Sequence, residues 1–270
     1  MKNLLRATCV AFGVGATGFA MAGSAYAADL PTVEPVAVAE PTIWDVAFGV
    51  KGANEYILRS VSQTRGHMAI QGYAELSLFD WVYAGAWASN VDFGGNDPST
   101  EADWYAGVRH TFDRLTLDVG YLDINYVGQK GGHDLDFWKI YGIAKYAVTD
   151  NITIGANVYW TSSYIGYNVD AGHASLFGKV SFPGVLPNPD LGLYVSGELG
   201  RNWVKEGFAP DYTFWNVGGG VTYKAATLDL RYTGANLSRT ECALTIGQRS
   251  SCGDRFLVSL SFDTSLSKIK

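Results

Sequence analysis

The sequence predicts an all-β fold: an up-and-down transmembrane antiparallel β-barrel of about 12 strands, preceded by a cleaved signal peptide. Three observations predict it. A short leader opens the chain, segments of alternating apolar and polar residues fill most of the remainder, and the connections between these segments are by turns short and long. This combination is typical of bacterial outer-membrane barrels, which have tight turns on one side of the membrane and long loops on the other.

Residues 1–27 have the pattern of a secretory signal peptide. Lys2 and Arg6 supply a positive start, residues 9–22 form an uncharged apolar run, and residues 25–27 read Ala-Tyr-Ala, a small-x-small cleavage site. The alternative is a membrane anchor helix, but the apolar run is short for crossing roughly 30 Å of hydrocarbon. No later stretch reaches about 18 uninterrupted apolar residues, so we expect no transmembrane helix.

Three segments follow the leader. Residues 28–43 contain three prolines among small residues and show no periodicity, so we expect an extended, poorly ordered lead-in on the periplasmic side. Residues 44–263 are expected to form the transmembrane barrel, and residues 264–270 a short C-terminal tail.

Alternation with a period of two residues starts at Trp44 and returns throughout the chain. In residues 70–78, for example, one face carries isoleucine, glycine, alanine and leucine, while the other carries Gln71 and Glu75. Such a pattern indicates a strand with one apolar and one polar face. The predicted strands, an even number as expected of bacterial barrels, are residues 44–51, 70–78, 82–89, 103–112, 115–121, 138–146, 152–160, 175–182, 191–199, 215–223, 228–233 and 255–262.

The connections between these strands fall into two alternating classes. The first class consists of tight turns and one longer member, at residues 79–80, 113–114, 149–151, 183–190 and 224–225. The second class is longer and rich in Gly, Asn, Asp and Pro, at residues 56–67, 92–100, 127–134, 162–172, 201–211 and 234–254. Short turns of such barrels face the periplasm and long loops face outward, so both termini should be periplasmic.

Alternation alone also fits a soluble β-sandwich, whose apolar faces point inward. Two features favour the barrel. The apolar faces are rich in Ala and Gly, which suit contact with lipid but would fill a sandwich core poorly. Aromatic residues also gather near both ends of the strands, as the two interfacial girdles of a membrane barrel would require. These aromatics are Trp44, Phe112, Tyr146, Phe182 and Tyr223 near the short turns, and Trp104, Trp138, Trp160 and Tyr232 toward the long loops.

The composition supports this class and excludes others. Charged residues are 17% of the chain and aromatic residues 14%, with 32 glycines. The chain has 20 Lys and Arg against 26 Asp and Glu; without Lys2 and Arg6 of the leader this leaves 18 against 26, a net charge of −8. That balance argues against nucleic acid as a partner. The sequence has no P-loop, EF-hand or zinc-ligand spacing, so we expect no cofactor and no metal.

Two cysteines, Cys242 and Cys252, remain after the leader is removed. An exported protein meets an oxidising compartment, which favours a disulfide between them in the last long loop. The bridge would close a loop of about ten residues and contribute about 2–3 kcal/mol of stability. The alternative is two free thiols or a metal site, although no histidine lies near them in the sequence to complete one.

Several stretches resemble the TorF-type porin family of proteobacterial outer-membrane proteins, long described as a domain of unknown function. Residues 83–93 (Tyr-Ala-Gly-Ala-Trp-Ala-Ser-Asn-Val-Asp-Phe) and 101–107 (Glu-Ala-Asp-Trp-Tyr-Ala-Gly) are similar to its most distinctive segment and the strand after it. The specific matches concentrate in residues 50–126. The chain departs from the family at Ser60, where glycine is usual, and in running past Phe262. The resemblance implies an outer-membrane barrel with a channel.

The polar faces of the strands carry charges of both signs and many aromatic rings. We expect most of the charges to form ion pairs across neighbouring strands and the rings to line or pack a narrow lumen. The mixed signs predict no strong ion selectivity. The residues expected to line the lumen are Lys51, Glu75, Tyr83, Trp87, Asp103, Tyr105, Arg109, Lys139, Tyr141, Glu198, Arg231 and Arg255.

These features lead to two functional hypotheses. The first is passive passage of small polar solutes, neutral or zwitterionic, through an aromatic-lined lumen in the outer membrane. The second is a non-conducting structural or surface barrel whose long external loops bind partners. Either would meet outer-membrane lipid and the outer-membrane assembly machinery. We expect no enzymatic activity, since none of the four histidines lies in a nucleophile motif.

Overall fold

The computed structural model describes residues 43–94, 98–130, 132–188 and 190–269. The predicted signal peptide (1–27) and all but the last residue of the predicted lead-in (28–43) lie outside these ranges.

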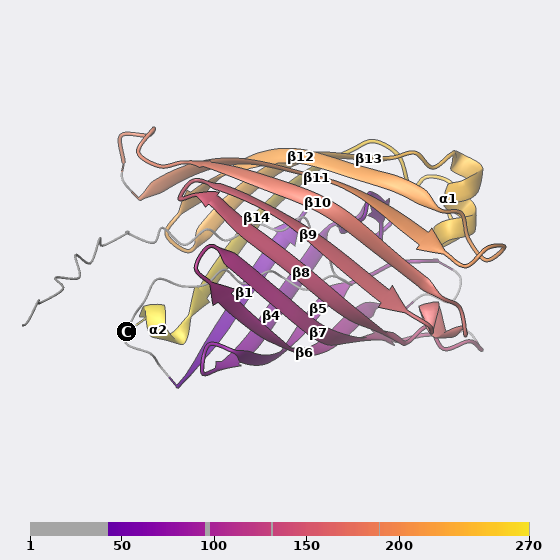
Figure 1. Ribbon diagram of the computed structural model, residues 1–270. Helices are drawn as coiled ribbons and strands as arrows, with labels where there is room; N and C mark the ends of the chain where they lie inside the picture. The colour runs from indigo at the N-terminus through magenta and orange to yellow at the C-terminus, as the bar shows by residue number, and fades with distance from the viewer. Residues whose placement is uncertain (1–42, 95–97, 131, 189, 270) are drawn as a thin grey trace, which may run out of the picture.

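Within the described residues, twelve strands form a closed antiparallel barrel, so the predicted fold class is confirmed (Figure 1). Each strand pairs with its neighbour along the chain, and β1 pairs with both β4 and β14 to close the ring. The barrel strands are β1 (Trp44–Ala53), β4 (Ala69–Leu78), β5 (Val82–Asn90), β6 (Thr100–Phe112), β7 (Leu115–Val127), β8 (Phe137–Thr149), β9 (Ile152–Thr161), β10 (Ala171–Phe182), β11 (Leu191–Val204), β12 (Tyr212–Tyr223), β13 (Ala226–Ala235) and β14 (Arg255–Ser265).

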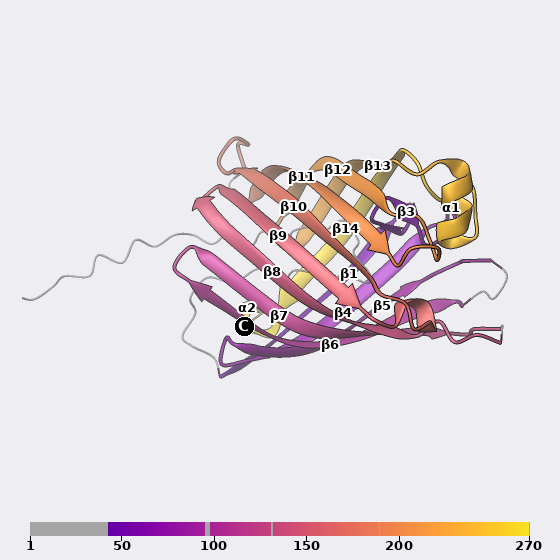
Figure 2. The ribbon, with the colours of Figure 1, turned by 45° about the vertical axis from the view of Figure 1, so that its right-hand side comes forward.

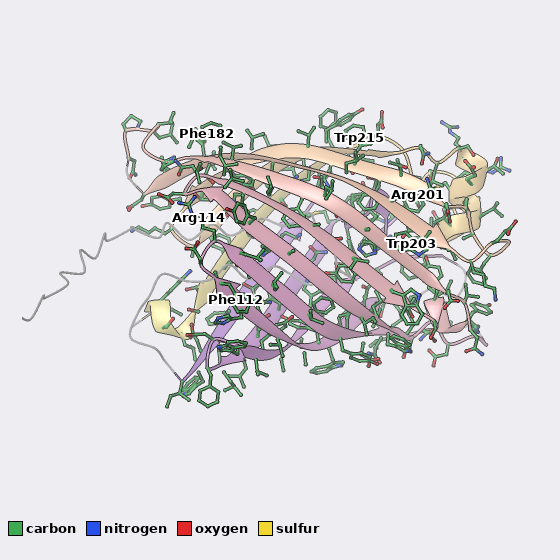
Figure 3. The ribbon with its side chains drawn as sticks, in the orientation of Figure 1. Phe112, Arg114, Phe182, Arg201, Trp203 and Trp215 are labelled. Carbon is green, nitrogen blue, oxygen red and sulfur yellow. A yellow bond between two sulfur atoms is a disulfide. The ribbon has the colours of Figure 1, made fainter. Side chains whose placement is uncertain are left out.

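The outward faces of the strands are apolar and exposed around the barrel. Val119 on β7 and Leu230 on β13 are 64% and 57% exposed. The register places Val119 beside Val108 of β6, so the apolar surface runs from strand to strand. Figure 3 shows Phe112 and Phe182 toward one end of this surface and Trp203 and Trp215 toward the other. An apolar band between two aromatic belts is what a bilayer requires of a barrel wall.

The two ends of the barrel differ. At one end lie the short turns 79–81, 113–114, 150–151, 183–190 and 224–225, together with the start of β1 and α2 (Leu266–Ile269) (Figure 1). At the other end lie the described residues of the long connections, 54–68, 91–94, 98–99, 128–130, 132–136, 162–170, 205–211 and 236–254. They carry β2 (Ile57–Leu58), β3 (Val61–Ser62), the 3-10 turn η1 (Tyr164–Gly166) and α1 (Arg239–Ile246). The predicted alternation of short and long connections is present.

The last strand is longer than the predicted barrel boundary. β14 continues to Ser265, which pairs with Ala47 of β1, so the tail begins at Leu266 instead of residue 264. The carboxylate of Asp45 accepts hydrogen bonds from the backbone amide (3.0 Å) and hydroxyl (2.7 Å) of Ser267. These bonds hold the start of α2 against the first strand.

Glycines on the inner wall make room for aromatic rings of the next strand. A Cβ on Gly107 would lie 2.6 Å from the ring of Tyr83, and one on Gly85 would lie 2.5 Å from the ring of Tyr105. Each ring therefore lies flat across a neighbouring strand where a larger residue would clash. This arrangement packs large side chains into the lumen without pushing the strands apart.

Among the described residues no helix is both long and apolar enough to cross a membrane.

Candidate functional site

The twelve residues predicted to line the lumen all lie on the inner wall. The register puts Glu75, Asp103 and Arg109 on the same face as the other inward residues, opposite the exposed valines and leucines. Most of these side chains are buried, while Lys51, Arg109 and Arg255 are half-buried. They do not form one cluster. Nine of them fall into three groups along and around the barrel, and the other three, Lys51, Asp103 and Tyr105, lie on the same wall.

The first group surrounds Arg109 near the short-turn end. Its Nε donates to Asp118 Oδ2 (2.7 Å) and its Nη1 to Glu75 Oε1 (3.1 Å), and the guanidinium lies 4.2 Å from the centre of the Tyr83 ring. The hydroxyl of Tyr83 donates to Asp118 Oδ1 (2.5 Å) and contacts the hydroxyl of Tyr141. Arg109 thus links strands β4, β6 and β7 from inside the barrel.

The second group surrounds Arg231 on β13. Its guanidinium donates to Asn216 Oδ1 (2.6 Å), Ser196 Oγ (2.8 Å) and both carboxylate oxygens of Asp229 (3.0 and 3.2 Å). Asn216 in turn donates to Glu198 Oε2 (2.9 Å). The group links β11, β12 and β13, and brings together two predicted residues, Arg231 and Glu198, through an asparagine that the prediction did not include.

The third group lies at the long-loop end. Trp87 packs edge-on against Tyr56 with ring centres 5.8 Å apart, and Lys139 lies 5.4 Å from the centre of the Phe137 ring. Arg255 Nη1 donates to both carboxylate oxygens of Glu55, at 2.7 and 3.0 Å. Tyr56 and Glu55 belong to the first long connection and not to the wall.

That connection is folded into the barrel, which corrects the prediction of an external loop at residues 56–67. Residues 55–64, called here the inner hairpin, are buried without interruption. Within them Ile57 pairs with Ser62 and Leu58 with Val61. Figures 1 and 2 both show the indigo hairpin inside the outline of the barrel near α1. The inner hairpin therefore occupies the lumen at the long-loop end.

The tip of the inner hairpin bonds three strands of the wall, β10, β12 and β13. The hydroxyl of Ser60 bonds the hydroxyl of Thr233 on β13 (2.5 Å) and donates to the carbonyl of Trp215 on β12 (3.2 Å). Arg59 Nη1 donates to Nδ1 of His173 on β10 (3.2 Å). Since the hairpin starts from β1 and β10 lies nearly across the ring from β1, the hairpin spans the mouth.

A small cavity lies beside the tip. Its volume is about 10 Å³, which is room for one water molecule. The residues that line it include Arg59, Lys139, Tyr159, His173 and Asn202. The imidazole of His173 stacks on the Tyr159 ring with centres 4.6 Å apart. This gap is too small for a solute, so the hairpin and the wall meet closely here.

The last loop, residues 236–254, covers the inner hairpin from outside. It contains α1 and the predicted disulfide between Cys242 and Cys252, which is present. Ser238 caps α1: its hydroxyl accepts from the Glu241 amide (3.2 Å), and its own amide donates to the Glu241 carboxylate (2.8 Å). Hydrogen bonds that the side chain and the amide of Ser238 make to the Glu241 carboxylate lower its pKa below the usual value.

Residues 39–262 match the sequence pattern of a bacterial protein family described as being of unknown function, Gcw_chp. The chain belongs to this family. No protein of curated function matches it in sequence.

Solved structures similar to this Gcw_chp protein include two porins and an outer membrane channel. The NanC porin has a TM-score of 0.49 at 11% identity, covering 80% of this chain and 98% of that one. The KdgM porin has a TM-score of 0.47 at 9% identity, covering 81% and 98%. An outer membrane channel from Pseudomonas putida F1 has a TM-score of 0.44 at 11% identity, covering 87% and 100%.

Sequence reasoning missed the inner hairpin of this Gcw_chp protein, although one signal was available. Ile57, Leu58 and Val61 are apolar and flank the two residues Arg59 and Ser60, which is the pattern of a tight hairpin and not of a solvated loop. Both tip residues have positive φ, 46° and 63°, as such a turn requires.

Proposed function

We propose that this chain is an outer-membrane barrel of the porin type that gives small polar solutes passive passage through a narrow lumen lined by aromatic and charged residues. One observation carries the proposal. The outer wall is apolar and exposed while the inner wall holds ionised groups such as Arg109, Glu75 and Arg231. A wall of this kind is stable where lipid lies outside and polar surroundings lie inside.

The orientation and partners follow from the same proposal. The short-turn end, with β1 and α2, faces the periplasm and the long loops face the exterior. Outer-membrane lipid surrounds the apolar band, and the assembly machinery of the outer membrane inserts the barrel. The resemblance of residues 50–126 to TorF-type porins supports this assignment. The proposal gives the chain no enzymatic activity.

The charges of the lumen favour neutral or zwitterionic solutes. Arg109 and Arg231 are each paired with carboxylates of the wall, so neither presents an unbalanced charge to a passing ion. Rings of unpaired charge are what make a pore strongly selective for one sign. We therefore propose weak discrimination between potassium and chloride.

A second candidate function has an observation in its favour. The inner hairpin spans the mouth, and Asp229, Asp103 and Glu75 are almost inaccessible to water in this arrangement. A barrel that stayed in this state would conduct nothing and would act through its external loops. The two candidates differ in one respect: whether the lumen of the native protein conducts.

We expect removal of the inner hairpin to open the barrel. In the variant, residues 56–64 are replaced by a short Gly-Ser linker, and single-channel currents are recorded in planar bilayers. The native protein should give small or rare steps and the variant several-fold larger ones, because the hairpin fills the mouth and its tip bonds strands β10, β12 and β13. A salt gradient across the bilayer should give a reversal potential near zero.

The matched control replaces residues 205–210, in another long connection, by the same linker. Its currents should equal those of the native protein, since Phe208 in that loop packs on Tyr164 and Tyr167 of the neighbouring connection. Silence from a correctly folded hairpin-less barrel would sink the channel proposal and favour the second candidate.

A further inference from the structure

We infer that the disulfide-closed last loop is a latch that holds the inner hairpin in the mouth of the barrel, so that opening the Cys242–Cys252 bond releases the hairpin. The inference deepens the proposed function, because its consequence for solute passage rests on the lumen being a passage. Release of the hairpin itself can be measured whether or not the barrel conducts.

The latch touches the hairpin at the disulfide itself. Val61 of β3 forms an antiparallel bridge with Cys252, and the amide of the next residue, Ser62, donates to the carbonyl of Ser251 (2.7 Å). The second strand of the hairpin thus has two neighbours, β2 on one side and residues 251–252 on the other. Displacement of residues 251–252 would leave the hairpin edge unpaired.

Apolar contacts join the same parts. Val61 packs with Tyr212 and Phe214 of β12 in a small cluster, and the residues of the last loop packed on that cluster are Leu237, Ile246 and Cys252. Cys242 is fully buried. The disulfide therefore forms part of the apolar cover over the hairpin.

Polar contacts extend the latch on both sides. Gln248 of the last loop accepts from Arg65 Nε (3.0 Å) and donates to the carbonyl of Phe93 (3.0 Å), which ties the loop to the end of the hairpin and to the neighbouring connection. Arg255, at the start of β14, donates to the Ser250 carbonyl and to Glu55 at the other end of the hairpin. The last loop thus bonds Arg65, next to one end of the hairpin, and is joined through Arg255 to Glu55 at the other end.

The disulfide is needed because helix α1 and the inner hairpin each have little stability of their own. Helix α1 spans only Arg239–Ile246, and helices this short are marginal in water without a tertiary constraint. The hairpin has only two residue pairs, Ile57 with Ser62 and Leu58 with Val61, and a hairpin of this size has little stability of its own. The bond between residues ten apart removes the freedom that would let the last loop move away.

Opening the latch is a reduction. A dithiol such as dithiothreitol transfers two electrons and two protons to the cystine, so that Cys242 and Cys252 become thiols while the reagent closes its own disulfide ring. Cys252 is partly exposed, so the thiolate of the reagent can reach its sulfur more easily than that of the buried Cys242. We propose reduction by a dithiol as the chemical signal that frees the hairpin.

The test is tryptic cleavage after Arg59, followed by mass spectrometry on the folded barrel in detergent micelles. Arg59 is buried at the hairpin tip, whereas Arg65 is exposed and gives a reference site in the same molecule. We expect dithiothreitol, or the double substitution Cys242→Ser and Cys252→Ser, to speed cleavage after Arg59 by about tenfold or more relative to Arg65.

The control is Leu244→Ser, which changes an exposed residue of α1 and keeps the disulfide; its cleavage pattern should match the native one. Alkylation shows whether the two thiols are free. If they are free and the rate of cleavage after Arg59 is unchanged, the latch proposal is wrong. Bilayer currents then separate the two claims. Suppose the hairpin-less barrel conducts, but trypsin still does not cleave after Arg59 in the reduced barrel. The proposed function would then stand, and the latch proposal would be wrong.

Discussion

Replacing Arg231 by methionine is expected to destabilise the barrel by about 3–5 kcal/mol. Arg231 is 5% exposed and donates to Asp229, Asn216 and Ser196. Methionine fills much of the same volume but donates nothing, so Asp229 would keep a buried charge without its main partner. Urea unfolding of the barrel in vesicles, followed by the loss of the compact species in unheated gel electrophoresis, measures the change.

The matched control is Arg201→Met. Arg201 also pairs with an aspartate, Asp211, at 3.2 Å, but it lies on the outside of β11 with its side chain largely exposed (Figure 3). An exposed pair of this kind contributes about 0–1 kcal/mol, so this variant should unfold almost like the native protein. Equal losses from the two substitutions would contradict the view that buried ion pairs hold the inner wall together.

Replacing Val119 by arginine is expected to cost about 2–4 kcal/mol of folding free energy in a bilayer. Val119 lies on the outward face of β7, between Val108 of β6 and Gly142 of β8, in the middle of the apolar band. An arginine there would place its guanidinium among acyl chains, where it finds no water. Refolding into vesicles at graded urea concentrations, followed by tryptophan fluorescence, measures the change.

Val185 supplies the control for that experiment. It has the same exposure as Val119, 64%, but lies in the short connection 183–190, beyond the end of the apolar band. In water the two sites would accept arginine equally well, since both are exposed. Only a surrounding bilayer makes Val119→Arg costly and leaves Val185→Arg neutral; equal tolerance of both would argue that the apolar face does not meet lipid.

The wall of the barrel could be predicted from the sequence because its determinants are local. A period of two residues assigns each side chain to a face, and the alternation of short and long connections assigns each strand end to one rim. The pairing Arg109 with Asp118 follows once two successive strands are joined by the turn at residues 113–114. The observed strands are longer than predicted, as at Val204 on β11, because pairing continues past the residues that show clear alternation.

The inner hairpin could not be predicted in the same way, because its burial depends on contacts with residues that are distant in the sequence. Ser60 bonds Thr233 and Trp215, which are more than a hundred residues away along the chain. Ser60 was flagged by the sequence as a departure from the resembling family, which usually has glycine there. Its φ of 63° explains why glycine suits the position, and its two hydrogen bonds show what serine adds.

The detailed ion pairing was also beyond the sequence. The inward strand faces offer several acidic partners for each basic residue, and the choice depends on side-chain reach and on the curvature of the wall. Arg231, for instance, pairs with Asp229 of its own strand, two residues before it, and bridges to Asn216 and Ser196 on the next two strands. No pattern of spacing in the sequence distinguishes this arrangement from a pairing with Glu198.

The most direct measurement concerns what touches the outer wall. A nitroxide label on Leu230→Cys, at an outward site of β13 that is 57% exposed, is compared in vesicles with a label on Val185→Cys in the short connection. The Leu230 label should collide often with oxygen, which concentrates in acyl chains, and rarely with a water-soluble nickel complex, with the reverse at Val185. Equal collision of both labels with the nickel complex would show that water covers the wall and would contradict the assignment of this protein to the membrane.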